Sequence, residues 1–370
     1  MSITIVPLEG DKLGSVRDFN SRIQAAGWGE FALPTDPTAF RRSHNTASPS
    51  ECWLAEARGA VRGGYCVRHQ QFSFRGTLRT ASHYSLSISE GVVDKTYSGV
   101  GPKMVLSAVA RQPRLFALGM GGLDRPLPRL LKALGWFLHE VPFYFQAIRP
   151  GRVLRNIRAL RTSMARRLVL DVSAYSGAAS LGVRGIQWVR RARGGRIVRC
   201  ESEQVDEFGP WADRLWEELH AEFAMIGDRR SEALNVIYPP SYPRLVRLKL
   251  SRAGHIVGWV VVMLSQTRGH KHFGDLRVGT IVDGLAASAS VAFVIDTASR
   301  YLVERGADLV ISNQTHHAWC AGLERSGFLR GPSNYIFAAS KGLAALLSPF
   351  EGRIREAHIN RGDGDGPIHL

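Results

Sequence analysis

The sequence predicts an α/β (α+β) protein of two domains, each a mixed central sheet flanked by helices, joined by a basic helical linker. Three observations support this prediction. The chain has 370 residues, more than one domain usually holds. Strand-like and helix-like stretches alternate twice along it, on either side of an arginine-rich segment. We therefore expect domains at residues 1–148 and 200–345, a linker at 149–199 and a tail at 346–370.

The elements of the first domain follow from hydrophobic periodicity. Residues 1–8 are predicted as a strand, and residues 10–26 as a helix whose apolar side chains recur every three or four positions. Two strands around a glycine turn follow at ECWLAEARGAVRGGYCVRHQQFSF, and HYSLSISEGVV alternates as a strand does. PKMVLSAVARQ predicts a helix with Pro102 at its first position, where a missing N–H costs nothing. The last elements are a strand at LFALGM, a helix at PRLLKALGW and a strand at VPFYFQAI.

The linker holds most of the net charge of +16. Residues 149–199 contain thirteen arginines, no lysine and one acid, Asp171. Residues 152–167 combine one apolar face with arginines around the rest, which predicts a basic amphipathic helix. Three interpretations stay open: a solvated linker packed on a domain, a helix on anionic membrane, or a segment that binds a phosphate-rich acceptor such as tRNA or a nucleotide- or lipid-linked sugar. Aromatic residues are sparse there, so tRNA is the less favoured partner, and DNA is not expected.

The second domain repeats the order of the first. Short glycine-aromatic pairs match at nearly one offset, Gly64-Tyr65 with Gly258-Trp259 and Gly135-Trp136 with Gly327-Phe328. These matches predict an internal duplication. In the tail, Asp363 and Asp365 have calcium-like spacing, but the other loop ligands and the closing glutamate are missing. We expect an ordered turn or a disordered end there, and no metal.

Cysteine usage and hydropathy bear on the compartment. Cys52, Cys66, Cys200 and Cys320 are far apart and form no CxxC pair, so we expect four reduced thiols in a reducing compartment. The N-terminus lacks the basic and apolar regions of a signal peptide. The longest apolar run is about half the length that spans a bilayer. We expect a cytoplasmic protein, at most peripheral to the inner face of the membrane.

The segment VDKTYSGVGPK, residues 93–103, lies between an alternating strand and a predicted helix. Glycine lets backbone approach an anion without a Cβ clash. A helix N-terminus supplies unpaired N–H groups and about half a positive charge. The segment is therefore predicted to be a phosphate-binding turn.

The element order and this turn resemble the GNAT acyltransferase fold. The whole chain resembles a tandem GNAT protein, of the kind that includes FemABX-like peptidyltransferases and acyltransferases of polysaccharide gene clusters. In that family the turn has a pattern like V-x-P-x-Y-R-G-x-G-x-G, whose amides bind the pyrophosphate of acyl-CoA. Here the Val, the Tyr and the first two glycines match, whereas Lys95, Ser98 and Lys103 replace Pro, Arg and the last Gly. The resemblance implies acetyl-CoA or another acyl-CoA as co-substrate, no metal, and binding by Val93, Ser98, Gly99, Val100, Gly101, Pro102 and Lys103.

The resemblance also implies direct attack of an amine on a thioester, which needs a base, donors for the oxyanion and an acid for the thiolate. Glu90, just before the turn, is the candidate base, and Tyr144 is the candidate group near the thiolate. Asp283 is the counterpart of Glu90 in the second half, where DGLAASASV lacks the glycine pattern. We expect that half to have lost acyl-CoA binding and to support the first. His316 and His317 are interpreted as polar residues at a helix start, since no third metal ligand is near.

These observations predict an acyl-CoA-dependent N-acyltransferase of tandem GNAT type. The resemblance alone suggests that its acceptor is an amino sugar or a cell-envelope or polysaccharide precursor. Two alternatives remain. One is a FemABX-like transferase that depends on aminoacyl-tRNA, and the other is a non-catalytic GNAT-derived scaffold at the membrane surface.

Overall fold

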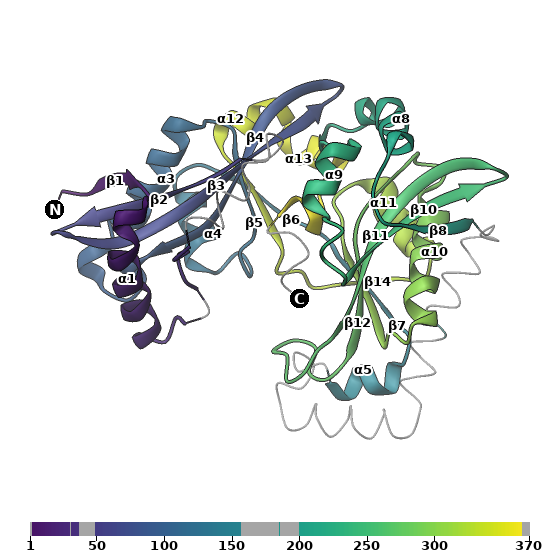
Figure 1. Cartoon of the computed structure of the whole chain (residues 1–370), viewed down its shortest axis with the longest axis horizontal. Coiled ribbons are helices and arrows are strands. Elements are labelled where there is room, and N and C mark those ends of the chain that lie inside the picture. Colours follow the sequence, from purple (N-terminus) through teal and green to yellow (C-terminus); the bar gives the residue numbers. More distant parts are fainter. Residues whose placement is uncertain (1, 30, 37–48, 157–184, 186–199, 365–370) are drawn as a thin grey trace. The chain divides into compact units, whose positions relative to one another are not determined.

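The chain folds into two compact units (Figure 1). The computed structural model describes residues 2–29, 31–36, 49–156, 185 and 200–364. The first unit comprises Met1–Glu140, Phe223–Asp228 and Asn334–Ile354, and the second comprises Val141–Glu222, Arg229–Ser333 and Arg355–Leu370. In the described part of the chain, we find no helix that is both long and apolar enough to cross a membrane. Each unit thus draws on separate segments, whereas the sequence suggested contiguous ranges.

The sheet of the first unit runs in the order β1-β2-β3-β4-β5-β15-β6, and β9 pairs with β3 beside that path. Strands β1 to β4 are antiparallel neighbours, whereas β4 and β5 are parallel. A parallel neighbour requires a crossover, which α3 supplies. The strands are β1 (Thr4–Pro7), β2 (Ser50–Ala57), β3 (Ala60–Phe74), β4 (Thr77–Ser89), β5 (Leu115–Gly119), β6 (Phe137–Glu140), β9 (Met225–Gly227) and β15 (Ile336–Ala339).

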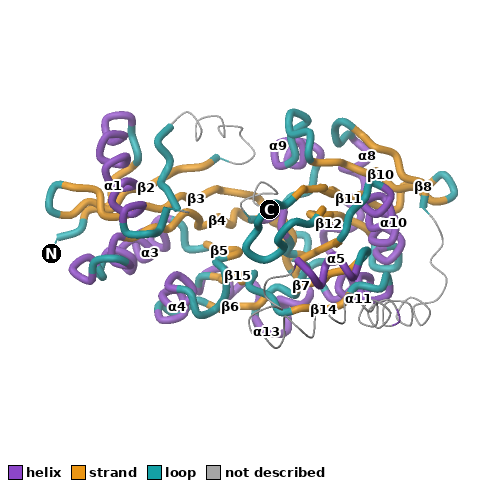
Figure 2. The backbone as a smooth tube through the Cα atoms, turned by 90° about the horizontal axis from the view of Figure 1, so that it is seen from below, coloured by secondary structure: helices purple, strands orange, loops and turns teal. Residues whose placement is uncertain are grey.

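Helices cover both faces of this sheet, as Figure 2 shows for α1 and α3. Adjacent residues of a strand point to opposite faces. Leu54 of β2 accordingly packs with α1, and Ala55 packs with α3. The predicted helical spacing is confirmed, because α1 buries Val16, Phe19 and Ile23. The helices are α1 (Leu13–Ala25), α3 (Val100–Arg111), α4 (Pro126–Ala133), α12 (Lys341–Ala344) and α13 (Phe350–Arg353), with 3-10 turns η1 (Gly10–Lys12) and η6 (Ala345–Leu347).

The sheet of the second unit runs in the order β14-β7-β13-β12-β11-β10-β8. Strands β12 and β13 are parallel, and the other neighbours are antiparallel. The strands are β7 (Phe143–Ala147), β8 (Glu201–Val205), β10 (Leu245–Arg252), β11 (His255–Gln266), β12 (Arg277–Ala286), β13 (Leu309–Asn313) and β14 (Leu329–Gly331). The helices are α5 (Pro150–Asn156), α8 (Pro210–Leu219), α9 (Ser231–Ile237), α10 (Val291–Glu304) and α11 (His317–Arg325).

The two units repeat one arrangement, which confirms the predicted duplication. The order β2-β3-β4-α3-β5-α4 recurs as β10-β11-β12-α10-β13-α11. Gly135 and Gly327 follow α4 and α11 with φ of 80° and 87°, the left-handed conformation with which many helices end. Each glycine precedes a buried aromatic residue, Trp136 or Phe328. The match of Gly135-Trp136 with Gly327-Phe328 therefore marks equivalent helix ends, whereas Gly64-Tyr65 and Gly258-Trp259 lie within the equivalent strands β3 and β11.

The second strand after each of these helices, β7 after α4 and β15 after α11, belongs to the sheet of the other unit. Tyr144 lies on β7, which pairs with β13 in the second unit and not with the first sheet. Strand β15 lies between β5 and β6 of the first unit, although it comes from the C-terminal part of the chain. Local sequence places each strand after its helix but carries no signal for its partner, so the sequence assigned both strands to the wrong sheet.

The expectation of four reduced thiols is wrong at two positions. Cys52 and Cys66 are directly opposite each other on β2 and β3 and form a disulfide. Cys200 and Cys320 are free. A cross-strand pair cannot be recognised from sequence spacing alone, because it depends on the register of the hairpin. The argument for a reducing compartment from cysteine usage therefore fails.

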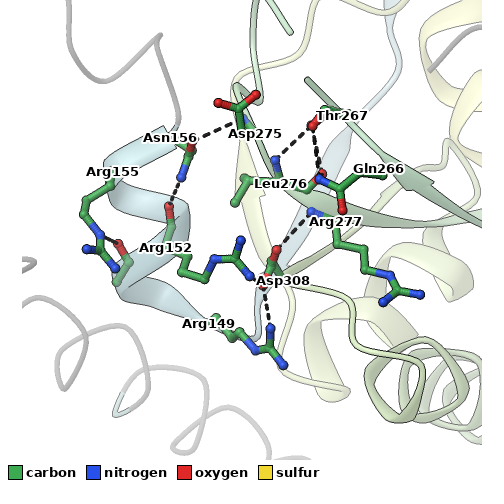
Figure 3. A network of polar contacts seen from close by, with 11 residues as sticks. Arg149, Arg152, Arg155, Asn156, Gln266, Thr267, Asp275, Leu276, Arg277 and Asp308 are labelled. Carbon is green, nitrogen blue, oxygen red and sulfur yellow. Dashed lines mark hydrogen bonds and ion pairs between the residues drawn. The ribbon is translucent and has the colours of Figure 1, made fainter. Parts of the chain in front are cut away.

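The start of the basic linker is anchored on the second unit (Figure 3). The buried carboxylate of Asp308 contacts the guanidinium groups of Arg149 and Arg152 at 3.2 and 3.0 Å. At the end of α5, the Asn156 side chain accepts the N–H of Asp275 at 3.1 Å. Arg149 and Arg152 therefore fix α5 to the strand ends beside it. The rest of the helix predicted at 152–167 lies outside the described residues.

The part of the predicted tail that the structure describes, residues 346–364, is folded. Residues 346–354 belong to the first unit, with α13 as their main element, and residues from 355 onward belong to the second. The boundary lies within η7 (Ile354–Glu356), and the second unit then includes β16 (Ala357–His358) and η8 (Arg361–Asp363). In η8, Asn360 and Asp363 form a reciprocal capping box. The ordered-turn interpretation is thus correct for Asp363, while Asp365 lies outside the described residues.

Candidate functional site

The predicted phosphate-binding turn lies between β4 and α3 in the first unit. Its first part folds on itself as η2 (Glu90–Val92) and η3 (Lys95–Tyr97). The N–H groups of Val93 and Asp94 donate to the carbonyl of Glu90, and the N–H of Ser98 donates to that of Lys95. The amides of Val93 and Ser98 are therefore engaged inside the turn, so these two predicted residues have no backbone donor to offer an anion.

The start of α3 retains free backbone donors. Among the described residues, the N–H groups of Gly99, Val100 and Gly101 have no hydrogen-bond partner, and no side chain caps the helix. Pro102 has no N–H, and that of Lys103 donates to the Gly99 carbonyl at 3.2 Å. Successive N–H groups at a helix start attract an anion. Of the residues predicted to bind phosphate, only these three therefore offer a backbone N–H. The exposed Lys103 lies in the first turn of α3.

The room around the glycines of the turn also differs between its first part and the start of α3. A Cβ on Gly91 would lie 2.6 Å from the Tyr97 carbonyl oxygen, so the first part of the turn is closed against itself. Among the described residues, a Cβ on Gly99 would meet only Ile3 within 4 Å, at 3.6 Å, which is an ordinary contact. The space beside the exposed Gly99 is therefore open, whereas the space beside Gly91 is filled.

Glu90, the candidate base, is held between two arginines. Its side chain is 8% exposed. Both carboxylate oxygens lie within 3.2 Å of guanidinium nitrogens of Arg22 and Arg62. The Arg62 guanidinium also stacks over the Tyr97 ring, with its Cζ 4.3 Å from the ring centroid. These contacts connect α1, β3 and the turn, so the structure gives Glu90 a clear structural role, and its role as a base stays a prediction.

We expect Glu90→Gln to lower the free energy of unfolding by about 1 to 3 kcal/mol, since it removes the counter-charge of the 17%-exposed Arg62 and leaves buried donors unsatisfied. Urea unfolding of the variant measures the loss. Asp94→Asn, which changes an exposed carboxylate of the same turn, is the control. An unchanged unfolding curve with a large fall in kcat would contradict the structural role and favour catalysis.

Tyr144, the second catalytic candidate, lies in the other unit. Its hydroxyl donates to Glu324 at 3.3 Å, and Cys320 lies close enough to hydrogen bond. Burial raises the pKa of Tyr144, and it raises the pKa of the Cys320 thiol to about 11. Tyr144 therefore keeps its proton at neutral pH, as a proton donor must. Glu90 and Tyr144 are not parts of one unit, and a shared role for them stays a prediction.

In the described part of each unit, two neighbouring strands are parallel, and their pairing stops before their carboxyl ends. In the first unit β4 and β5 pair only from Ser82 to His83. In the second, β12 and β13 pair as far as Ile281 and Ser312. Ligands of open α/β sheets bind in the crevice at the carboxyl ends of such strands. These two regions are therefore the equivalent candidate sites of the duplicated fold.

The second region is filled by the C-terminal segment of the chain. Asn360 forms a β-bridge with Gln314, next to β13, and its side chain donates to Asp283 of β12 at 2.6 Å. Arg361 Nε donates to the Asn313 side chain at 2.9 Å. A Cβ on Gly362 would lie 2.0 Å from the Tyr238 hydroxyl, so packing is tight. The segment thus contacts both strands just beyond the point where they part.

A buried charge network anchors this segment. The Asp283 carboxylate lies 2.8 Å from Arg229 Nε and accepts the Tyr238 hydroxyl at 2.7 Å. Arg229 also contacts Asp363 at 2.6 Å. All these side chains are almost completely buried. Asp283, the predicted counterpart of Glu90, is therefore enclosed by protein groups.

Sequence reasoning missed most of this network. Arg229, Tyr238 and Asn360 are far apart along the chain, and no local pattern joins them. The one available signal was N-R-G-D at residues 360–363, which has the spacing of a capping box. His316 is buried at the start of α11 and His317 is the first helical residue, which agrees with the interpretation as polar residues at a helix start. In the part that the structure describes, no His, Cys, Asp and Glu side chains form a metal-binding group.

Two mixed sheets, each with a parallel pair and a crossover helix that starts beside it, give the chain a GNAT-type fold that occurs twice. No protein-family profile and no curated protein matches the sequence. Among solved structures, the chain is similar to a GCN5-related N-acetyltransferase from Anabaena variabilis, with a TM-score of 0.53, 9% identity, and coverage of 91% of this chain and 72% of that one.

Two further structures support the same fold. A probable N-acyltransferase from Enterococcus faecalis has a TM-score of 0.51 and 10% identity, covering 94% of this chain and 75% of its own. N-myristoyltransferase of Saccharomyces cerevisiae, solved with myristoyl-CoA and inhibitors, has a TM-score of 0.51 and 9% identity, covering 92% and 79%. The resemblance to GNAT proteins is confirmed at the level of the fold.

Proposed function

We propose that the protein is an N-acyltransferase that takes its acyl group from acyl-CoA and binds this donor in the first unit. The observation that supports the site most directly is the set of N–H groups at Gly99, Val100 and Gly101 that have no partner among the described residues, with the exposed Lys103 in the same turn of α3. Such groups suit the pyrophosphate of CoA. The equivalent region of the second unit is occupied by residues 357–363, which favours a single donor site.

The reaction joins an amine to the acyl group. The acceptor nitrogen attacks the thioester carbonyl carbon, a C–N bond forms, and the C–S bond breaks. The acceptor nitrogen loses a proton to a base, and the departing thiolate gains one. The preceding strand β4 contains a bulge near Leu86, which has φ of 48°. Bulges next to active sites free or redirect backbone groups, and we infer that the donors for the oxyanion lie there.

The acceptor is proposed by class only. GNAT-type transfer needs a neutral amine, and we propose an amino sugar or a cell-envelope or polysaccharide precursor as its carrier. A panel of amino sugars offered with labelled acetyl-CoA tests this choice. Transfer of an amino acid from aminoacyl-tRNA to the acceptor amine, with release of the tRNA and no use of acyl-CoA, would instead favour a FemABX-like reaction.

We expect isothermal titration to show acyl-CoA binding, and Lys103→Glu to weaken it about five- to tenfold. The substitution replaces a cation in the first turn of α3 by an anion, a change of about 1 kcal/mol in interaction with a nearby phosphate. Lys132→Glu, an exposed lysine of α4 in the same unit, is the matched control and should bind normally. Absence of binding by acetyl-CoA and by longer acyl-CoAs, in a folded sample, would overturn the proposed function.

A further inference from the structure

The second unit contains a polar pocket where β11 ends and the connection to β12 begins. It has a volume of about 440 Å³, and its lining includes Arg244, Ser265, Gln266, Arg268 and His270. No carboxylate is among the lining residues that the structure describes. The pocket lies near the start of β12, whereas the C-terminal segment fills the region near the other end of that strand. It is therefore separate from the candidate region of its own unit, and none of its lining residues belongs to the first unit.

The two arginines of the pocket differ in how they are held. Arg244 donates to the Ser265 hydroxyl at 3.0 Å and contacts Met263 sulfur at 3.8 Å, which positions its guanidinium over the end of β11. Neither partner neutralises its charge. Arg268 is exposed, and its side chain has no partner among the described residues. The pocket thus offers one guanidinium held by a hydrogen bond and a second, exposed guanidinium that has no partner among the described residues.

His270 adds a neutral donor of defined direction. Its Nδ1 accepts the N–H groups of His272 and Phe273, each at 3.2 Å, and its ring stacks on Phe273 at 5.2 Å. Because Nδ1 accepts, the neutral ring carries its proton on Nε2. Burial, followed by the charges of His272 and Lys271, lowers the pKa of His270. The imidazole is therefore a neutral Nε2–H donor around neutral pH.

The backbone of this pocket is rigidly closed. Gly269 N–H donates to Asp275 at 2.6 Å, and His270 and Gly274 form a β-bridge. Thr267 Oγ1 donates to the Leu276 carbonyl at 2.9 Å and accepts the Leu276 N–H, as Figure 3 shows. The Asp275 carboxylate is thereby occupied by a backbone donor. These bonds fix the backbone that carries Arg268 and His270 before any ligand arrives.

We propose that this pocket binds a phosphoryl group. Its lining provides guanidinium and imidazole donors and no opposing carboxylate, and guanidinium groups match the oxygens of phosphate in charge and geometry. The group comes either from a soluble phosphorylated molecule or from the head group of an anionic lipid. The proposal is independent of the acyl-donor site and stands whether or not acyl transfer is confirmed.

Isothermal titration of the full chain with sodium pyrophosphate at fixed ionic strength tests the proposal. We expect binding that Arg268→Gln weakens about tenfold, the effect of removing one charge-assisted hydrogen bond. Arg214→Gln, an exposed arginine of α8 in the same unit, should bind as the unmodified chain does. Urea unfolding establishes that both variants fold. No binding by the unmodified chain, or equal weakening by both variants, would overturn the proposal.

Vesicles distinguish the two sources of the phosphoryl group. Flotation with phosphatidylcholine vesicles, with and without phosphatidic acid, is measured for the unmodified chain and for Arg268→Gln. Capture that requires phosphatidic acid and falls about tenfold in the variant assigns the pocket to a lipid head group. Pyrophosphate binding that depends on Arg268 without such capture assigns it to a soluble phosphorylated ligand.

Discussion

Replacing Arg229 by methionine should lower the free energy of unfolding by about 3 to 5 kcal/mol. The substitution keeps the side-chain volume but leaves the carboxylates of Asp283 and Asp363 buried without a cation. Removing one partner of a buried ion pair has a cost of this size because the other charge stays desolvated. Urea unfolding at neutral pH measures the change, and Arg214→Met on exposed α8 is the control.

A second variant separates charge from packing. Combining Arg229→Met with Asp283→Asn and Asp363→Asn leaves no unpaired charge, so part of the lost stability should return. Burial raises the pKa of Asp363, with Arg229 opposing that shift and Asp283 adding to it. If the triple variant is less stable than Arg229→Met alone, hydrogen bonding and not charge balance dominates this network.

The chain should also lose about 3 kcal/mol of stability between pH 6.5 and pH 4 through His358. Burial lowers the pKa of His358 from 6.5 to about 4, and each pKa unit corresponds to about 1.4 kcal/mol. Because the folded-state pKa is the lower one, this stability is complete above pH 6.5 and is lost as pH falls through the window. Unfolding free energies measured across this range give the slope.

The comparison with His358→Gln isolates this contribution from other titrating groups. The variant cannot ionise, so its stability curve should be flatter than that of the unmodified chain by about the same 3 kcal/mol. His255→Gln, an exposed histidine at the start of β11, should leave the slope unchanged. Parallel pH profiles for the unmodified chain and His358→Gln would mean that His358 is accessible to water in the folded state.

Local sequence predicted many of the helices and strands, and the resemblance to GNAT proteins predicted the fold, but neither predicted the long-range connections. The helices at α1 and α3 and the strand hairpins follow from periodicity, and the glycines after α4 and α11 identify the duplication. The partner of the Tyr144 strand could not be predicted, since a buried strand pairs equally well with any neighbour of suitable pattern. The Cys52–Cys66 disulfide likewise depends on register, which the sequence of a hairpin defines only when its turn is known.

The candidate site shows the same limit. The glycine turn could be found because its residues are consecutive in the sequence. Of the seven residues predicted to bind acyl-CoA, Gly99, Val100 and Gly101 keep a backbone N–H without a partner among the described residues. The engagement of Glu90 by Arg22 and Arg62 joins residues up to 68 positions apart, which no local pattern reveals. The network around Asp283 extends from Arg229 to Asp363, a range that includes most of the C-terminal half. Burial of charge by distant segments is a property of the packed chain.

The position of β15 has a consequence for biosynthesis. This strand lies between β5 and β6, so β6 gains its place in the first sheet only after residue 339 has left the ribosome. The network of the second unit needs Asp363 as well. Domains usually fold from the N-terminus as they emerge, but here neither half can be completed until nearly the whole chain has been made. A stalled or truncated translation product would therefore expose unpaired strand edges, and separate expression of the two halves should yield insoluble material.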